Sequence, residues 1–394
     1  MTLFFLVMFY TLTGLLLLAV AAAPVDIFIN GIDHVLFVSC SPSFFSDFKR
    51  QLHDGDIIVN WGRSALSCTG CTWTKSENGL VIVPYILSPK YTSPQVSLFM
   101  NAMQEMESVT CMRFVQRTNE GDYLNIVETG GCASFIGRIG GPQDLYLNSS
   151  TCMTWGTIQH EILHSLGFVH EHTRNDRDNN VAIMYKFISP ESISNFDKVD
   201  TNNLNIGYDF YSVMHHPGSA FSNTPGKNTI VPKPDPSIPI GQRNGLSTLD
   251  VAKINALYQC DISATLLPDA NGTVTSDNYP AMYPNNCNYV WLIRVPSGQV
   301  TLKFNVFDVE ASAGCSADYV QIYNGLSKAS PVLLGKTCGA ALIPLMISSS
   351  NQVLIEFVTN NAVVGRGFNI TYGTGNITVP FMIHFMPPLF WNIL

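Results

Sequence analysis

The sequence predicts a mixed α+β domain followed by an all-β sandwich. Between residues 79 and 260, stretches with helical periodicity are interleaved with stretches that alternate like strands. Beyond Cys260, short alternating stretches are separated by Gly, Pro and Asn turns, which is typical of a sandwich of about 110 residues. The 394 residues are 46% hydrophobic and 11% aromatic, so the chain can fill the cores of roughly two or three domains. Wholesale disorder is therefore excluded.

Residues 1–23 form an almost unbroken apolar leader that ends in small residues. Such a segment predicts a signal peptide and a secreted, extracellular protein, with storage in secretory granules as an open variant. Because no Lys or Arg precedes the run, and because it is long enough to span a bilayer, an uncleaved anchor stays an alternative. The formal net charge of −8 and the lack of a Lys/Arg cluster exclude nucleic acid as a partner.

The cysteines and the glycosylation triplets agree with secretion. Ten cysteines spread through the chain predict a disulfide framework in an oxidising compartment. Four N-x-S/T triplets predict glycosylation on surface turns, at Asn148, Asn271, Asn369 and Asn376.

The α+β domain is expected to begin with a strand and a helix. Residues 79–87 alternate like a strand, and the helix that follows is expected to have Ser93 as its N-cap and Pro94 at its first position. The apolar residues of this helix recur on one face, which we assign to the core and not to a methionine-rich metal site: Val96, Phe99, Met100, Met103 and Met106. Residues 112–117 and 123–128 are predicted as strands.

Two further helices are expected in this domain. Residues 156–168 have an apolar side that faces the core, and Gly167 is expected to end the helix in the left-handed conformation. Residues 225–242 contain five prolines and predict a long surface loop. The last helix is expected from Ser247 to Tyr258, with Ser247 and Asp250 as a capping box.

Residues 160–164 spell H-E-x-x-H within the second of these helices. The i, i+4 spacing places His160 and His164 on one face, where they can bind one Zn²⁺ per chain, and Glu161 lies beside the metal as a general base for the attacking water. The pattern continues through Gly167 to His170, which completes a His₃ site with an open position for water. The sequence therefore predicts a catalytic zinc.

This segment resembles the signature of the astacin family of metzincin metalloproteases. The resemblance extends over residues 64–260, and SVMHH at residues 212–216 resembles the family's Met-turn, in which Met214 is an apolar floor beneath the zinc ligands. It implies a metzincin-type protease fold and a zinc-dependent metalloendopeptidase. Within the family the likeness is greatest to the hatching enzymes of fish and amphibian embryos, in particular at residues 76–88 and 234–247.

The resemblance also implies disulfide pairs. The family's pairing, carried onto this chain, is Cys111–Cys260 and Cys132–Cys152. Cys68 and Cys71 stand where the hatching enzymes carry an extra cysteine pair, which favours a structural Cys68–Cys71 bridge over redox chemistry.

Residues 261–373 resemble a CUB module, and this identifies the predicted sandwich as CUB-like. The resemblance covers Trp291 and the segments 279–286, 315–325 and 365–372, and it implies a Cys315–Cys338 bridge. Cys287 and Cys40 are left without an evident partner. The apolar tail at residues 374–394 has no assigned role.

Some CUB modules bind Ca²⁺ through one Glu and two Asp residues. Glu310 and Asp318 match two of these positions and are candidate Ca²⁺ ligands. Asn360 stands where the second Asp is expected, so the sequence leaves Ca²⁺ binding open.

Residues 24–63 resemble the family's propeptide, in which an aspartate coordinates the zinc in place of water. Asp54-Gly55-Asp56 matches that motif with Asp56 as the switch residue, although His53 replaces the usual aromatic residue. An ordinary Asp-Gly-Asp turn is the alternative. The bond between Arg63 and Ser64 is the expected cleavage site, and the new ammonium group of Ser64 is expected to pair with Glu171.

One residue departs from the family inside the predicted active site. The Met-turn is normally followed by His and then Tyr, whose hydroxyl contacts the zinc or the tetrahedral intermediate, and here His216 occupies the Tyr position. We expect His216 to donate to the oxyanion with a poorer fit, and the enzyme to be slower than its relatives. The alternative is that His216 points away and water fills the gap.

Together these features predict a secreted, monomeric zinc endopeptidase that is made as a zymogen and acts on extracellular matrix proteins, in particular those of an egg envelope. A developmental processing protease would share the chemistry and differ in its substrate. A catalytically weak, CUB-mediated adhesion protein is the alternative in another class. The intact set of His160, Glu161, His164 and His170 argues against a decayed enzyme.

Overall fold

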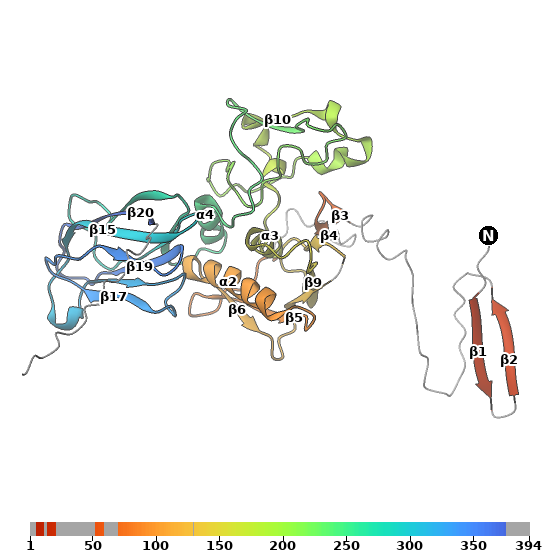
Figure 1. The fold of residues 1–394 in the computed structure, drawn as a ribbon, viewed down its shortest axis with the longest axis horizontal. Coiled ribbons are helices and arrows are strands. Elements are labelled where there is room, and N and C mark those ends of the chain that lie inside the picture. Colours follow the sequence, from red (N-terminus) through yellow and green to blue (C-terminus); the bar gives the residue numbers. More distant parts are fainter. Residues whose placement is uncertain (1–4, 12–13, 21–51, 59–69, 129, 376–394) are drawn as a thin grey trace, which may run out of the picture. The chain divides into compact units, whose positions relative to one another are not determined.

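The computed structural model describes residues 5–11, 14–20, 52–58, 70–128 and 130–375 (Figure 1). The chain divides into two compact units, Met1–Phe44 and Phe45–Leu394. In the first unit, β1 (Phe5–Thr11) and β2 (Gly14–Val20) form an antiparallel pair. The predicted signal peptide falls on this segment, and its cleavage stays a prediction. Within the described ranges, no helix has the length and apolar character needed to cross a membrane.

The described part of the second unit starts with a short hairpin. β3 (Leu52–His53) pairs antiparallel with β4 (Ile57–Ile58), so Asp54-Gly55-Asp56 forms the turn between them. The hairpin is attached to the protease domain through backbone hydrogen bonds, because Ser134 N–H donates to Asp56 O and Ile58 N–H donates to Ser134 O, both at 2.9 Å. These bonds fix the position of Asp56.

A five-stranded mixed sheet forms one layer of the predicted protease domain. Its strand order is β6-β5-β7-β9-β8, and only the edge strand β8 is antiparallel to its neighbour. The strands span Met112–Gln116 (β6), Val81–Leu87 (β5), Tyr123–Val127 (β7), Pro142–Leu147 (β9) and Cys132–Ala133 (β8). The strands expected at 79–87, 112–117 and 123–128 are therefore confirmed.

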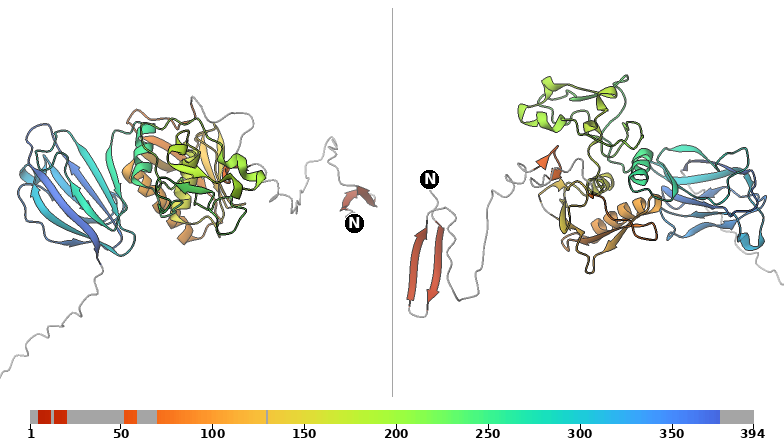
Figure 2. Two further views of the ribbon diagram at one scale, coloured as in Figure 1. Left: turned by 90° about the horizontal axis from the view of Figure 1, so that it is seen from above. Right: turned by 180° about the vertical axis from the view of Figure 1, so that it is seen from behind.

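Helix α2 (Ser93–Val109) packs beside α3 (Trp155–Ser165) and buries Phe99, Met103 and Met106, as expected of its apolar face (Figures 1 and 2). The prediction is wrong for Met100, which is 43% exposed, and Val96 is only partly buried. Its predicted N-cap is wrong by one residue. The cap is Thr92, because the Gln95 side chain reaches back and its Oε1 accepts a hydrogen bond from Thr92 N–H at 2.9 Å.

Helix α3 begins after the N-cap Thr154 and is shorter than expected, because the chain leaves the helix at Leu166. Gly167 follows with φ +105°, the left-handed stop that the sequence predicted. Helix α4 (Thr248–Leu257) has the predicted capping box, in which Ser247 Oγ accepts from Asp250 N–H at 2.9 Å and the Asp250 carboxylate accepts from Ser247 N–H at 3.0 Å.

The segment between α3 and α4 contains mostly short elements. These are the two-stranded sheet of β10 (Val181–Ile183) and β11 (Ile230–Pro232) and four 3₁₀ helices at Glu171–Thr173, Arg177–Asn179, Tyr185–Phe187 and Pro190–Phe196. A small core holds this segment together, and its fully buried members are Val181, Ile188, Phe196 and Ile230.

The predicted CUB domain is a sandwich of two sheets (Figure 2). One has the order β12-β14-β19-β16-β17, and the other has the order β13-β20-β15-β18. The strands span Ser263–Leu267 (β12), Asn271–Thr275 (β13), Asn288–Arg294 (β14), Gln299–Asp308 (β15), Tyr319–Tyr323 (β16), Val332–Thr337 (β17), Met346–Ile347 (β18), Gln352–Val358 (β19) and Gly367–Gly375 (β20). A short 3₁₀ helix lies at Ala313–Cys315. The predicted fold class, an α+β protease domain followed by an all-β sandwich, is confirmed.

The structure contains the disulfides Cys111–Cys260, Cys132–Cys152 and Cys315–Cys338. Cys71 is also disulfide-bonded, whereas Cys68 and Cys40 lie outside the described residues. Cys287 is a free thiol.

Three of the predicted glycosylation sites can be placed in the structure. Asn271 is exposed at the start of β13, Asn148 is half-buried directly after β9, and Asn369 is half-buried within β20. Asn376 and the rest of the tail lie outside the described residues, and glycosylation stays a prediction.

Candidate metal centre

Three imidazoles converge at the C-terminal part of α3. His160 and His164 lie one helical turn apart, and their Nδ1–H groups donate to the backbone carbonyls of Val213 and Phe168, both at 2.8 Å. These bonds leave the Nε2 atoms free to face a common point. Gly167 then turns the chain so that His170 returns to the same point. His170 Nε2 and His164 Nε2 each lie 3.2 Å from His160 Nε2.

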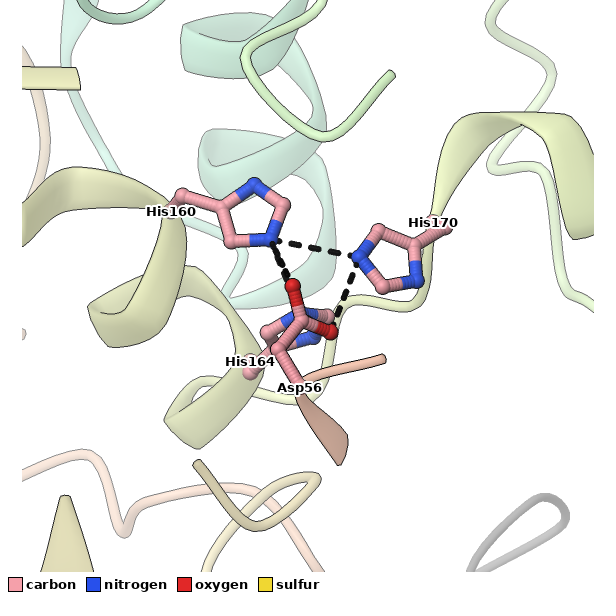
Figure 3. A group of neighbouring side chains, drawn as sticks. All are labelled: Asp56, His160, His164 and His170. Atoms are coloured by element: carbon pink, nitrogen blue, oxygen red, sulfur yellow. Dashed lines mark hydrogen bonds and ion pairs between the residues drawn. The ribbon is translucent and has the colours of Figure 1, made fainter. Parts of the chain in front are cut away.

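The carboxylate of Asp56 lies against the same three Nε2 atoms (Figure 3). Its Oδ2 is 3.1 Å from His160 Nε2, and its Oδ1 is 3.4 Å from His164 Nε2 and 3.1 Å from His170 Nε2. The ligand atoms of all four residues lie within 4.8 Å of one another. Three imidazole nitrogens and one carboxylate oxygen are a donor set that suits four-coordinate Zn²⁺, so the residues present fit this ion.

The electrostatics of the histidines also suit a cation. Burial lowers the pKa of His160 to about 3, against the opposing effect of Asp56, so this imidazole is in the neutral form that binds metal. Burial also disfavours a charge on His170, but the carboxylates of Asp54 and Asp56 outweigh it and raise the pKa of His170 to about 10. Metal binding at His170 would release that proton.

Glu161 follows His160 on α3 and is 1% exposed. Its Oε2 has no hydrogen-bond partner within the described part of the chain. Burial, and after it the charge of Asp56, raises the pKa of Glu161 well above its ordinary value. A buried carboxyl group with a high proton affinity and an unpaired oxygen can accept and hold a proton.

The turn that contains Met214 is held from both sides. Met214 is buried, and its carbonyl oxygen accepts a hydrogen bond from Glu171 N–H at 3.1 Å. The Asp250 carboxylate accepts hydrogen bonds from Ser212 Oγ–H at 2.6 Å and from Val213 N–H at 2.9 Å. The capping box of α4 therefore anchors the turn whose Val213 carbonyl orients His160.

His216 is buried, but it does not belong to the group of converging Nε2 atoms. Its Nε2 lies 3.5 Å from Asp54 Oδ1, and its ring centroid is 4.2 Å from that of His170. It belongs to a second group of potential ligands, with Asp54 and His170. Its expected role as an oxyanion donor stays a prediction.

Asp54 had no predicted role of its own, although it is part of the Asp-Gly-Asp motif. Asp54 is 1% exposed, and His170 Nδ1–H donates to its Oδ2 at 2.5 Å. Burial alone would raise the pKa of Asp54, but the neighbouring charges of His170 and His172 hold it well below its usual range. Asp54 is thus a buried carboxylate on the opposite edge of His170 from Asp56.

Glu171 is buried, and it already has partners in this structure. Lys253 Nζ lies 2.7 Å from its Oε2, and its Oε1 accepts from Arg174 Nη1–H at 3.1 Å and from Asp209 N–H at 2.8 Å. Glu171 and Lys253 line a cavity of about 360 Å³ that also borders Cys71. Arg63 and Ser64 lie outside the described residues, so the expected pairing of Ser64 with Glu171 stays a prediction.

The candidate Ca²⁺ ligands of the CUB domain lie close together and are bonded to neighbouring groups. Buried Asp318 accepts hydrogen bonds from Tyr283 Oη–H at 2.6 Å and from Asn360 N–H at 2.7 Å. Asn360 Nδ2–H in turn donates to Glu310 Oε2 at 2.8 Å. Asn360 thus contacts both candidate ligands, through its backbone N–H and through its side-chain amide.

Comparison with known proteins assigns each of the two domains to a family. The sequence matches the astacin peptidase family over residues 70–259 and the CUB domain family over residues 260–372. It is 53% identical to Embryonic protein UVS.2 of Xenopus laevis over 326 residues, which are 83% of this chain and 63% of that protein. It is 46% identical to the Astacin-like metalloendopeptidase of Gallus gallus over 338 residues, which are 86% of this chain and 83% of that protein.

A third relative is similar to this chain over a shorter stretch of about half of its length. High choriolytic enzyme 1 of Oryzias latipes is 47% identical over 213 residues, which are 54% of this chain and 79% of that protein. Its solved structure, described as a hatching enzyme zinc-protease, aligns at 48% identity with a TM-score of 0.49 and covers 50% of this chain and 100% of that chain.

Proposed function

The chain belongs to the astacin family of metalloendopeptidases and carries a CUB domain, and on this premise we propose that it is a secreted zinc endopeptidase, made as a zymogen, that cleaves egg-envelope proteins. The observation that supports the chemistry is the convergence of three Nε2 atoms next to the buried carboxyl group of Glu161. The proposed substrate rests on the relatives, two of which are named as an embryonic protein and a choriolytic enzyme.

The residues of the site have different roles in the proposed hydrolysis of a peptide bond. His160, His164 and His170 would hold Zn²⁺, which when bound supplies Lewis-acid activation of the attacking water. Glu161 accepts the proton that this water loses and delivers it to the amine leaving group. Met214 closes the site from below as an apolar floor.

His216 is proposed as a donor to the oxyanion once the propeptide has left. Its ring is held by its neighbours His172 and Phe221, with centroid distances of 4.8 and 5.2 Å. In the arrangement seen here it faces Asp54, so the proposed role belongs to the cleaved enzyme.

The proposed latency follows from the position of Asp56. Its carboxylate lies at the point on which the histidines converge, where substrate and water would otherwise meet the metal. Cleavage of the predicted propeptide, residues 24–63, at the bond between Arg63 and Ser64 would remove it. The freed ammonium group of Ser64 could then enter the cavity beside Glu171, where Lys253 now provides the positive charge.

A carboxyl-to-amide substitution tests the proposed function. Glu161→Gln should retain zinc near one per chain, yet lose about 10²–10⁴-fold in rate on isolated egg-envelope protein, because an amide cannot accept the proton. Metal analysis and hydrolysis of the envelope by the cleaved enzyme measure both quantities. Glu191→Gln, at an exposed carboxylate, is the matched control and should match the wild type. A Glu161→Gln enzyme with full zinc and wild-type rate would contradict the mechanism.

A further inference from the structure

We propose that His170, His172 and His216 form a carboxylate-binding site, here called the histidine cradle, and that Asp54 occupies it as a second anchor of the propeptide. The inference rests on the proposed latency and deepens it. Asp56 contacts the Nε2 edge of His170, whereas Asp54 contacts its Nδ1 edge. One imidazole is therefore held between two carboxylates of the same turn.

The cradle places one nitrogen of each histidine near the carboxylate of Asp54. Asp54 Oδ2 accepts from His170 Nδ1–H at 2.5 Å, while Oδ1 lies 3.5 Å from His216 Nε2 and 3.6 Å from His172 Nε2. All four side chains are at most one-tenth exposed. A carboxylate buried to this degree is costly unless charged or polar groups surround it. The bond from His170 Nδ1–H offsets this cost at Oδ2, whereas Oδ1 has no hydrogen-bond partner among the described residues and faces the rings of His216 and His172 at longer range.

Aromatic rings line the cradle, and the turn at Gly55 packs closely against one of them. The ring of Phe196 packs against His172 with centroids 5.5 Å apart, and that of Phe221 packs against His216 at 5.2 Å. Gly55 has φ +92°, and a Cβ there would lie 3.2 Å from Phe221 Cζ. The left-handed glycine therefore lets the turn come close enough for both carboxylates to reach His170.

The backbone of the turn is held as well. Asp54 N–H donates to Asn195 Oδ1 at 3.0 Å, and Asn195 O accepts from His172 Nε2–H at 3.0 Å. The same residue thus orients a histidine of the cradle and the backbone of the segment that fills it.

The three histidines that converge on the metal position differ in what orients them. His160 and His164 donate through Nδ1 to backbone carbonyls of the protease domain, but His170 donates to Asp54, in the segment predicted to be removed. Groups that bond the far nitrogen of a metal-binding histidine fix its ring and tune its basicity. Departure of the propeptide would therefore empty the cradle and remove the partner of the far nitrogen from His170, whereas the far nitrogens of His160 and His164 would keep their backbone partners.

The proposal is tested by measuring how tightly a fluorescent peptide hydroxamate binds to the uncut, zinc-loaded full chain. The probe binds only where the propeptide has left the metal position. Asp54→Ala should raise the affinity of the uncut chain by about 10–100-fold, because losing a buried charge-assisted bond increases the open fraction that binds the probe. After cleavage at Arg63, Asp54→Ala and wild type should bind equally. Asp33→Asn, which removes one charge elsewhere in the predicted propeptide, should leave both affinities unchanged.

A double-mutant cycle tests the cradle itself. His216→Phe should also raise the affinity of the uncut chain, expressed relative to its own cleaved form, and Asp54→Ala combined with His216→Phe should add little to either alone. Asp54→Asn, which keeps the shape of the side chain, replaces Asp54→Ala if that variant is poorly secreted.

Two outcomes would overturn the proposal and can be distinguished. If Asp56→Ala raises the affinity of the uncut chain and neither Asp54 variant does, the cradle has no anchoring role although latency holds. If none of the three variants raises it, the latency proposed for residues 24–63 fails together with the cradle.

Discussion

The protease domain and the CUB domain each bring together residues that can bind a metal ion, but the two clusters differ in what their donor atoms already contact. Around His160 and His164, the hydrogen bonds to Val213 and Phe168 occupy the far nitrogens and leave the Nε2 atoms aimed at one point. In the CUB domain, the oxygens of Asp318 accept bonds from Tyr283 and Asn360. The two clusters therefore differ in the direction of the lone pairs that remain for a cation as well as in residue type.

Loss of a histidine of the metal site is the change for which we expect the largest effect, and it tests this comparison directly. His164→Ala should abolish stable zinc binding and reduce peptide hydrolysis by the cleaved enzyme by about 10³-fold or more, because the metal supplies several kcal/mol of transition-state stabilisation at ~1.4 kcal/mol per factor of ten.

The control for this prediction comes from the CUB domain. Glu310→Gln removes a candidate ligand there and should leave zinc content and rate at their wild-type values. Metal analysis together with hydrolysis of a fluorogenic peptide checks both variants. A His164→Ala chain that still holds one zinc would mean that the three Nε2 atoms are not the metal site.

The metal site could be predicted because its geometry is local. The spacing of His160 and His164 on a helix and the left-handed turn at Gly167 are decided by residues close in sequence, and the structure has the helix and the turn. The capping box of Ser247 and Asp250 was predictable for the same reason. The N-cap of α2 was displaced by one residue because several polar residues precede Pro94, and only the reach of Gln95 selects Thr92.

Contacts between distant residues were not predictable in this way. Asp54 and His170 are 116 residues apart, and the Glu171–Lys253 pair spans 82 residues. The departure at His216 was visible in the sequence, but its neighbour Asp54 was not, since that contact depends on how the β3–β4 hairpin docks on Ser134. In the same way, the substitution at Asn360 was visible, whereas its bond to Glu310 was not.

A buried acid of the protease domain gives a pH-dependent prediction of intermediate size. Asp209 is 4% exposed and accepts bonds from Ser247 Oγ–H and Tyr211 N–H. Burial, and then the charge of Asp250, raises the pKa of Asp209 from 3.8 to about 6. Because the folded protein prefers the protonated form, the stabilising contribution of Asp209 is complete below about pH 4 and is lost as the pH rises through about 6.

Asp209→Asn removes this dependence. We expect the variant to be more stable than wild type by about 1–2 kcal/mol at pH 7.5, within the limit of ~1.4 kcal/mol per unit of raised pKa, and equally stable near pH 4. Urea denaturation at both pH values measures the difference, and Asp269→Asn, at an exposed position, is the control. A gain at pH 4 as large as that at pH 7.5 would rule out titration of Asp209 as the cause.

The smallest expected effect is on Ca²⁺ binding by the CUB domain. Asn360→Asp would supply the third carboxylate expected in CUB modules that bind Ca²⁺ and would remove the Nδ2–H donor that now occupies Glu310 Oε2. The backbone bond from residue 360 to Asp318 would be retained, so the geometry of the cluster should survive. Because Ca²⁺ affinity rises with the number of charged oxygen ligands, we expect Asn360→Asp to bind Ca²⁺ about tenfold more tightly than wild type.

Calorimetric titration of Ca²⁺ into the full chain measures this gain, with Asn361→Asp at the exposed neighbouring position as the control for added charge. Without Ca²⁺, three carboxylates in contact repel one another, so Asn360→Asp should also lower the thermal unfolding temperature, and Ca²⁺ should restore it. If wild type already binds Ca²⁺ as tightly as Asn360→Asp, the bonds of Asp318 and Glu310 to Asn360 do not compete with the ion. The contrast between the two clusters would then fail, because hydrogen bonds within the protein to the CUB oxygens would not weaken their binding of a cation.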